Sequence, residues 1–263
     1  MKEPISIEVH NLTVSYGAGP VLWDIDFELP SGKIIGVIGP NGSGKTTLLK
    51  AIMGLLHPSS GYVKVFNKSL DEVRERVAYV PQRTTVDWDF PASVYDVVMM
   101  GRYRKSNLFK RANKADKEIV DNAIEKVGLT EFKNRQISQL SGGQQQRVFI
   151  ARALAQKAEL YLMDEPFVGV DAATESSILA ILQEMREEGK TVLIIHHDLQ
   201  TVSEYFDYLV LLNTRLIAKG ELSEVLTKEN LSNAYGGQLT LLSKVVEIIK
   251  KTEFPIREKD VDL

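Results

Sequence analysis

The sequence predicts an α/β protein in which helices cover a mainly parallel sheet, and two observations carry this prediction. Short runs rich in Ile, Val and Leu recur at residues 34–39, 160–163, 192–195 and 208–212. Continuous apolar runs of this length are typical of parallel strands that are buried on both faces. Helical patterns at residues 144–156 and 172–189 lie between the later runs, and this alternation indicates an α/β core.

Two regions depart from that alternation. In the first sixty residues, turn sequences such as YGAGP and HPSSG separate short strands, so we expect an antiparallel β-subdomain there. Residues of about 86–140 are rich in helical pattern, with a 3.6-residue apolar period at 115–129, and we expect an inserted helical subdomain. Residues 105–114 form a basic stretch, and the tail of about 243–263 is expected to be peripheral.

Composition excludes several classes of function. The net charge of −3 provides no overall basic field for binding nucleic acid, and the absence of cysteine excludes disulfides and thiol chemistry. No apolar run approaches the roughly 20 residues of a spanning helix, so we expect that the chain does not itself cross a membrane.

The strongest motif is GPNGSGKTT, which follows a predicted strand and precedes the helical pattern TTLLKAIMG. Glycines let backbone N–H groups converge on phosphate oxygens, Lys45 reaches the β- and γ-phosphates, and the Thr46 hydroxyl is a ligand for Mg²⁺. The residues expected to bind ATP here are Gly39, Pro40, Asn41, Gly42, Ser43, Gly44, Lys45, Thr46 and Thr47.

Carboxylates follow at the end of another apolar strand, in LYLMDEP. Asp164 is expected to hold Mg²⁺ through water, and Glu165 to polarise the attacking water. A histidine pair ends the strand TVLII. An imidazole at His197 could touch phosphate and water, whereas His196, on the opposite face, is expected to be structural.

Together with LSGGQQQR, these motifs make residues of about 10–218 resemble the ATP-binding subunit of ABC transporters. The resemblance implies a phosphate-loop, RecA-like core and one ABC ATPase domain over residues 1–263. It also implies that two chains pair head-to-tail with ATP, each signature capping the γ-phosphate held by the other chain. The residues that would serve the partner's ATP are Ser141, Gly142, Gly143, Gln144 and Asp171.

The same resemblance assigns further roles. Tyr16 would stack on adenine, Gln82 would sense Mg²⁺ and the attacking water, and the His-Asp pattern selects His197. It thus names Lys45, Gln82, Glu165 and His197 as catalytic. Asp171 stands in VGVD where the family usually has S-A-L-D, so communication between two sites could be tuned differently.

Two longer segments, WDFPASVYDVVMMGRY and EPFVGVDAATE, make the chain resemble the ATPases of bacterial manganese, zinc and iron importers in particular. Manganese is the favoured metal. The implied partners are a polytopic permease docking near residues 82–105 and, through it, an extracellular solute-binding protein. The chain would lie on the cytoplasmic face of the membrane, held by the permease. Side chains suited to a groove for an apolar helix are Trp88, Phe90, Tyr95, Met99 and Met100.

Two alternatives remain open from the sequence. Importers of ferric siderophores, haem or cobalamin have similar segments, and a non-transport ATPase such as an iron–sulfur assembly factor shares the motifs. Translation factors usually carry two such domains and repair ATPases a long coiled-coil insertion, whereas this chain has a single phosphate loop and no room for the insertion.

Overall fold

The structure is a computed structural model that describes residues 4–17, 19–103 and 112–236. This part of the chain divides into two compact units, which are described separately. Unit 1 contains the residues up to Leu70 together with those from Ile195 onward, and unit 2 spans Asp71–Ile194. The predicted peripheral tail and most of the basic stretch at 105–114 lie outside the described residues.

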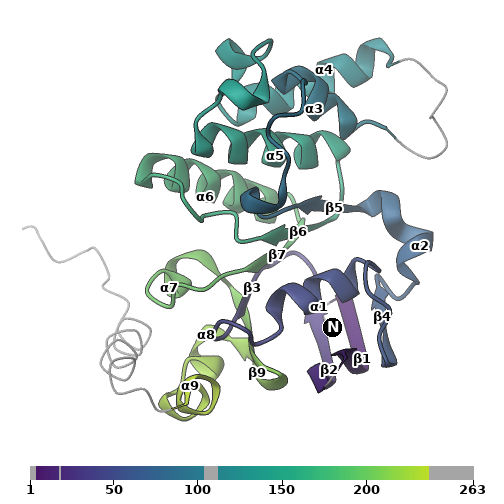
Figure 1. Ribbon diagram of the computed structural model, residues 1–263, viewed down its shortest axis with the longest axis vertical. Coiled ribbons are helices and arrows are strands. Elements are labelled where there is room, and N and C mark those ends of the chain that lie inside the picture. Colours follow the sequence, from purple (N-terminus) through teal and green to yellow (C-terminus); the bar gives the residue numbers. More distant parts are fainter. Residues whose placement is uncertain (1–3, 18, 104–111, 237–263) are drawn as a thin grey trace, which may run out of the picture. The chain divides into compact units, whose positions relative to one another are not determined.

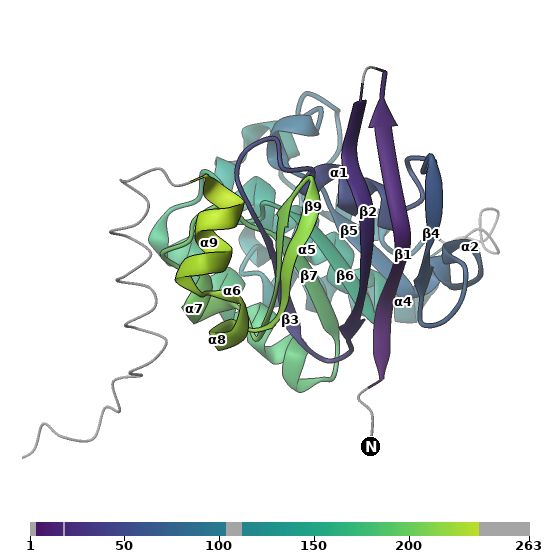
Figure 2. The same cartoon turned by 90° about the horizontal axis from the view of Figure 1, so that it is seen from below.

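Unit 1 contains the antiparallel subdomain expected from the first sixty residues. β1 (Ile5–Tyr16) lies between β2 (Gly19–Pro30) and β4 (Ser60–Val65) and pairs antiparallel with both, as Figures 1 and 2 show. Large apolar side chains of β1 and β2 are fully buried, because a sheet can place alternate residues against one core. α1 (Lys45–Ile52) lies beside this sheet and contributes Leu48 and Leu49 to the core (Figure 1).

Unit 1 also contains two of the predicted parallel strands. β3 (Ile34–Ile38) pairs parallel with β8 (Tyr208–Asn213), so these two expectations are confirmed. A third strand, β9 (Arg215–Glu221), continues from β8 as an antiparallel hairpin that the sequence analysis did not predict. Most of β9 is partly exposed and mixes apolar with charged residues, so it lacks the continuous apolar run that marked the other strands.

The short helices of unit 1 follow its strands. α7 (Val202–Tyr205) precedes β8, and α8 (Leu222–Val225) and α9 (Lys228–Tyr235) follow β9 (Figure 2). The side chain of Thr227 caps α9 by accepting a hydrogen bond from the Asn230 amide.

Unit 2 contains the remaining predicted strands. β6 (Leu160–Asp164) neighbours β7 (Thr191–Ile195), and it pairs parallel with β5 (Val77–Val80), a strand that was not predicted. Every residue of β6 is buried, as the apolar run LYLM predicted. The carboxyl end of β6 therefore brings Asp164 out of a buried strand at the edge where parallel sheets expose functional groups.

Helices make up most of the rest of unit 2. α2 (Leu70–Val73) opens it, and α3 (Val94–Met100), α4 (Lys114–Lys126) and α5 (Gly142–Gln156) pack together, as Figure 1 shows. α6 (Ala172–Glu187) follows β6. Helices α3, α4 and α5 each begin with a capping box, in which side chains satisfy amide groups of the first turn. The predicted helical segment of about 86–140 thus contains α3 and α4.

Within the described ranges, no helix combines the length and apolar character that crossing a membrane requires. A single ABC ATPase domain over the whole chain stays a prediction.

We expect Asp207→Ala to lower the free energy of unfolding by about 1–3 kcal/mol, because it leaves a buried amide without its acceptor. The Ile34 amide donates to Asp207 Oδ2 over 2.9 Å, and the Asp207 amide donates to the Ile34 carbonyl over 2.9 Å, so this pair aligns β3 with β8. Urea denaturation followed by circular dichroism measures the change. Asp207→Asn keeps a side-chain oxygen and serves as the control; equal stability of the parent and both variants would contradict the assigned role.

Candidate functional site

The phosphate loop of unit 1 has a shape that only glycine permits at two positions. Gly39 has φ +154° and Gly44 has φ +97°, both in the region that side-chain-bearing residues avoid. A Cβ on Gly39 would overlap the carbonyl oxygen of Leu212, and one on Gly44 would lie 2.5 Å from Leu22 Cδ2. The end of β8 and the strand β2 therefore hold the loop from two sides.

Lys45 is the first residue of α1 and its ammonium is already positioned by the loop. Nζ donates to the carbonyl oxygens of Gly39 and Pro40 over 2.9 and 2.8 Å, and the side chain is largely buried. Ser43 Oγ is buried beside it and has no hydrogen-bond partner among the described residues. A buried ammonium, a buried hydroxyl with unused capacity and a glycine-rich turn suit a phosphate group.

Thr46 lies on the exposed side of the same helix start, so its hydroxyl is accessible to a cation beside bound phosphate. Thr47 is partly buried, whereas Asn41 and Gly42 are exposed at the tip of the loop. These positions fit the chemistry expected for ATP with Mg²⁺.

The remaining predicted residues of unit 1 flank this loop. Tyr16 ends β1, is about half exposed (53%), and pairs with Gly19 at the end of the hairpin that contains Leu22. The His196 amide donates to the Val37 carbonyl over 3.0 Å, so the histidine pair lies beside β3, which leads into the loop. His197 is exposed and His196 is buried, as the expected division into functional and structural roles requires.

In unit 2, Gln82 and Glu165 come together although 83 residues separate them. Gln82 Nε2 donates to Glu165 Oε2 over 2.8 Å. Glu165 has φ +50°, an uncommon conformation for a residue with a side chain, directly after the buried Asp164. Such backbone strain clusters at functional sites, where the surrounding structure holds a side chain in one direction.

The signature begins α5 and is built around its N-cap. Ser141 Oγ accepts a hydrogen bond from the Gln144 amide over 3.4 Å, and Gln144 Oε1 accepts one from the Ser141 amide over 2.9 Å. Ser141 remains exposed, whereas Gly143 is buried. The amide groups of this first turn and the positive end of the helix dipole favour an anion.

Asp171 is placed next to the signature by packing. It caps α6 by accepting hydrogen bonds from the Thr174 amide and hydroxyl over 2.9 and 3.0 Å, and these bonds lower the pKa of its carboxyl group. A Cβ on Gly143 would lie 3.0 Å from Thr174 Oγ1. The start of α6 and the start of α5 are therefore in contact, and Gly143 makes room for Thr174.

The sequence analysis missed Arg83. Its guanidinium lies against the first turn of α5, with Nη1 3.4 Å from Gln145 Oε1 and 2.5 Å from where a Gly142 Cβ would be. The only signal in the sequence is a basic residue directly after Gln82, which does not reveal its direction.

A hollow of about 390 Å³ lies on the proposed docking side of unit 2. Its lining residues are Asp71, Glu72, Arg74, Glu75, Met100, Gly101, Tyr103 and Gln156. Its large apolar lining residues, Met100 and Tyr103, are exposed, and so is Phe90 of the predicted set. The hollow thus combines acidic residues from 71–75 with Met100 and Tyr103 of the predicted docking segment.

The rest of that predicted set packs inside unit 2. Met99 is buried, and the Trp88 ring meets Phe149 of α5 edge-on at 5.2 Å. Lys133 Nζ lies 4.8 Å from the centre of the Tyr95 ring. Only part of the predicted docking segment is therefore available to a partner, and Lys105 lies outside the described residues.

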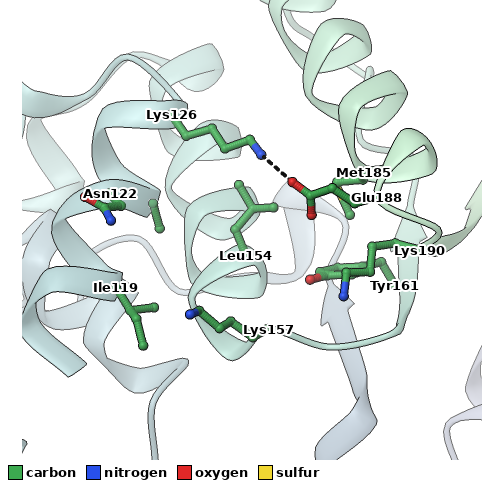
Figure 3. Close-up of a pocket in the computed structure, with 10 residues that line it drawn as sticks. Ile119, Asn122, Lys126, Leu154, Lys157, Tyr161, Met185, Glu188 and Lys190 are labelled. Atoms are coloured by element: carbon green, nitrogen blue, oxygen red, sulfur yellow. Dashed lines mark ion pairs between the residues drawn. The ribbon is translucent and has the colours of Figure 1, made fainter. Parts of the chain in front are cut away.

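A second hollow of about 370 Å³ lies near the carboxyl end of α5 and contains none of the predicted site residues (Figure 3). Its wall combines apolar side chains such as Leu154 and Met185 with an ion pair between Lys126 and Glu188 at 3.7 Å. Burial raises the pKa of Tyr161 in this wall to about 12, so its hydroxyl stays protonated.

The two units divide the predicted site between them. Unit 1 contains Tyr16, the phosphate loop and His197, and unit 2 contains Gln82, the signature, Asp164, Glu165 and Asp171. Within unit 2 the structure joins Gln82 to Glu165 and the signature helix to the helix that Asp171 caps.

Comparison with known proteins gives concordant results. The family model described as ABC transporter matches residues 22–168. The chain is 55% identical over 240 residues to the manganese transport system ATP-binding protein MntB of Bacillus subtilis (strain 168), covering 91% of this chain and 96% of that protein. It is also 55% identical over 235 residues to the zinc transport system ATP-binding protein TroB of Treponema pallidum (strain Nichols), covering 89% and 88%.

A solved structure agrees with these relatives. An inward-facing ABC transporter, provisionally assigned to the metal-chelate type, superposes with a TM-score of 0.77 at 31% identity. The alignment covers 88% of this chain and 89% of that one.

We expect the stability of the protein to fall between pH 6.5 and pH 4 partly through His196. Burial, and then the neighbouring His197, lower the pKa of His196 from 6.5 to about 4, so the folded state keeps it neutral while the unfolded chain takes up a proton. Its contribution is therefore fully present above pH 6.5 and is lost as the pH falls, on the order of 3 kcal/mol at most.

Chemical denaturation of the parent and of His196→Gln at several pH values measures this effect, and the variant should show a shallower decline. His57→Gln, at an exposed histidine, is the control and should follow the parent. Parallel pH curves for parent and His196→Gln would exclude the assigned cause.

Proposed function

This chain belongs to the ABC transporter family, and from that membership we propose that it powers the import of a divalent metal ion, manganese or zinc, through a membrane permease. As a member of that family it is an ATPase coupled to transmembrane transport, and a permease is its partner. The observation that carries the choice of cargo is the 55% identity, over about nine-tenths of the chain, to both a manganese and a zinc ATP-binding protein. Manganese is our first choice.

We assign ATP binding to the phosphate loop and Tyr16. The buried ammonium of Lys45 lies where it would meet the β- and γ-phosphates, and Ser43 Oγ has unused hydrogen-bonding capacity there. Mg²⁺, held by Thr46, Gln82 and, through water, Asp164, would neutralise charge that develops on the phosphates. Tyr16 offers an exposed ring on which adenine could stack.

We assign activation of the attacking water to Glu165. The hydrogen bond from Gln82 fixes one carboxylate oxygen, and the left-handed backbone at Glu165 fixes the direction of the side chain. A carboxylate that is already oriented loses little freedom when it accepts a proton from water. His197, which belongs to unit 1 like the phosphate loop, would stabilise the phosphate and the water.

Two copies of the chain would complete two sites. Ser141, Gly142, Gly143 and Gln144 present the positive start of α5, which suits the γ-phosphate held by the other copy. A shift of the signature on binding phosphate would be passed to Asp171 through Thr174, which packs against Gly143. ATP would close the pair and hydrolysis would reopen it, so the chemistry serves a conformational cycle.

We place the permease on the hollow lined by Met100 and Tyr103. Its apolar side chains suit a short helix, and Asp71, Glu72 and Glu75 on its rim suit basic residues beside that helix. The chain would then lie at the cytoplasmic face of the membrane, and an extracellular solute-binding protein would deliver metal to the permease.

Replacing Glu165 with Gln should lower the ATPase rate by about 10²–10⁴-fold while ATP binding is retained, because the amide cannot accept the proton from water. Cells of the native host carrying this change should lose manganese selectively under metal limitation. Phosphate release from purified protein and elemental analysis of cells measure the two effects.

Glu187→Gln removes the same charge from an exposed position of α6 and should behave like the parent. An unchanged ATPase rate in Glu165→Gln would disprove the role of Glu165. Loss of ATPase with normal manganese and zinc content would disprove metal import, and a fall in zinc alone would assign zinc as the cargo.

Replacing Tyr103 with Glu should abolish metal uptake and co-purification with the permease, yet leave the ATPase rate of the isolated chain within about two-fold of the parent. The added carboxylate adds to an acidic rim and opposes burial of an apolar helix there. Tyr62→Glu is the matched control, because Tyr62 is also about half exposed but lies on β4 of unit 1. Normal uptake in Tyr103→Glu would place the permease elsewhere.

A further inference from the structure

Arg83 lies directly over the start of the signature helix. If Gly142 had a Cβ, that atom would be 2.5 Å from Nη1 and 3.0 Å from Cζ of Arg83. A Cβ on Gly169, near the start of α6, would lie 3.8 Å from Nη2. The guanidinium therefore occupies space left by Gly142 and lies in contact distance of Gly169, between the start of α5 and the loop before α6.

The backbone of Arg83 is anchored by a hydrogen bond of its own. Trp88 Nε1 donates to the Arg83 carbonyl over 2.9 Å, and the Trp88 ring packs on Phe149 of α5. Gln145, one turn into the same helix, accepts from Arg83 Nη1 and donates through Nε2 to the Ile137 carbonyl over 3.2 Å. Arg83 is thus held in place by α5 itself.

This position is electrostatically unfavourable without an anion. In the part of the chain that the structure describes, no carboxylate forms an ion pair with Arg83, and its one side-chain hydrogen bond is the long contact with Gln145. The neighbouring helix start also has a positive potential, so the guanidinium and the helix dipole oppose each other. A phosphate that approached both would relieve the repulsion and find charge-assisted donors.

The geometry points to Arg83 as a binding residue for the γ-phosphate of ATP held by a second copy of this chain, acting beside the signature. This inference rests on the proposed head-to-tail function of the signature. The Ser141 hydroxyl, whose oxygen accepts from the Gln144 amide, keeps its hydrogen available for the same phosphate. Arg83 adds a full positive charge to a site that otherwise offers neutral donors and a helix dipole.

The experiment measures ATP-driven dimerisation of the full-length chain carrying Glu165→Gln, which prevents turnover. Sedimentation velocity with Mg²⁺ gives the ATP concentration at half-maximal dimer. Adding Arg83→Gln should raise that concentration by about 10-fold, and Arg83→Lys should raise it by no more than about 3-fold, because lysine keeps the charge without the planar fork. The difference between parent and Arg83→Gln should shrink at high salt.

Lys157→Gln is the matched control. Lys157 caps the opposite end of α5, about 24 Å from Ser141 along the helix axis, and the substitution removes the same charge. It should dimerise like the parent. Thermal unfolding and binding of a fluorescent ATP analogue by the monomer should be unchanged in Arg83→Gln, which separates loss of a phosphate contact from loss of structure.

The outcomes distinguish the two levels of the proposal. If the Glu165→Gln parent forms no dimer with ATP, the head-to-tail function is wrong and the role of Arg83 with it. If the parent dimerises and Arg83→Gln dimerises at the same ATP concentration, Arg83 does not bind the phosphate. Equal losses in Arg83→Lys and Arg83→Gln together with a lowered unfolding temperature would also overturn the inference, because they would indicate a structural role.

Discussion

The close approach of the phosphate loop to β2 and β8 is the constraint on which the proposed ATP site depends. Gly39 has no room for a side chain because of the Leu212 carbonyl, and Gly44 has none because of Leu22. Since both neighbours belong to strands of a packed core, the loop keeps its shape before any phosphate arrives. The same packing buries Lys45 against two loop carbonyls, so its ammonium is held at the loop.

The sequence predicted those parts of the molecule in which local chemistry and fold agree. Three such parts are the phosphate loop, the buried strand ending in Asp164 and the capped start of α5. In each, an apolar pattern gives the element, and a residue with one favoured position, such as glycine in a turn or serine at a helix start, marks its end. The antiparallel character of the first sixty residues followed from turn residues in the same way, although the pairing of β1 with β2 and β4 did not. By contrast, β9 is half exposed and has no regular pattern, so packing against β8 alone reveals it.

Other features depend on contacts between distant residues and could not be predicted from spacing. The hydrogen bond between Gln82 and Glu165 requires β5 and β6 to be neighbours, and periodicity does not give strand order. The direction of Arg83 depends on the space at Gly142, 59 residues further along the chain (142 − 83). The hollow proposed to receive the permease likewise joins Asp71, Glu72, Arg74 and Glu75 to Met100 and Tyr103, which lie far along the chain from them.

The contact between Arg83 and Gly142 also restricts how this family of chains can diverge. A side chain at position 142 would displace the guanidinium, so Arg83 keeps this direction only while residue 142 is glycine. The two positions should therefore co-vary among relatives. Where Ser or Ala replaces the first glycine of the signature, a shorter side chain should stand at the position after the glutamine. A change in the nucleotide affinity of the signature would then involve both positions together.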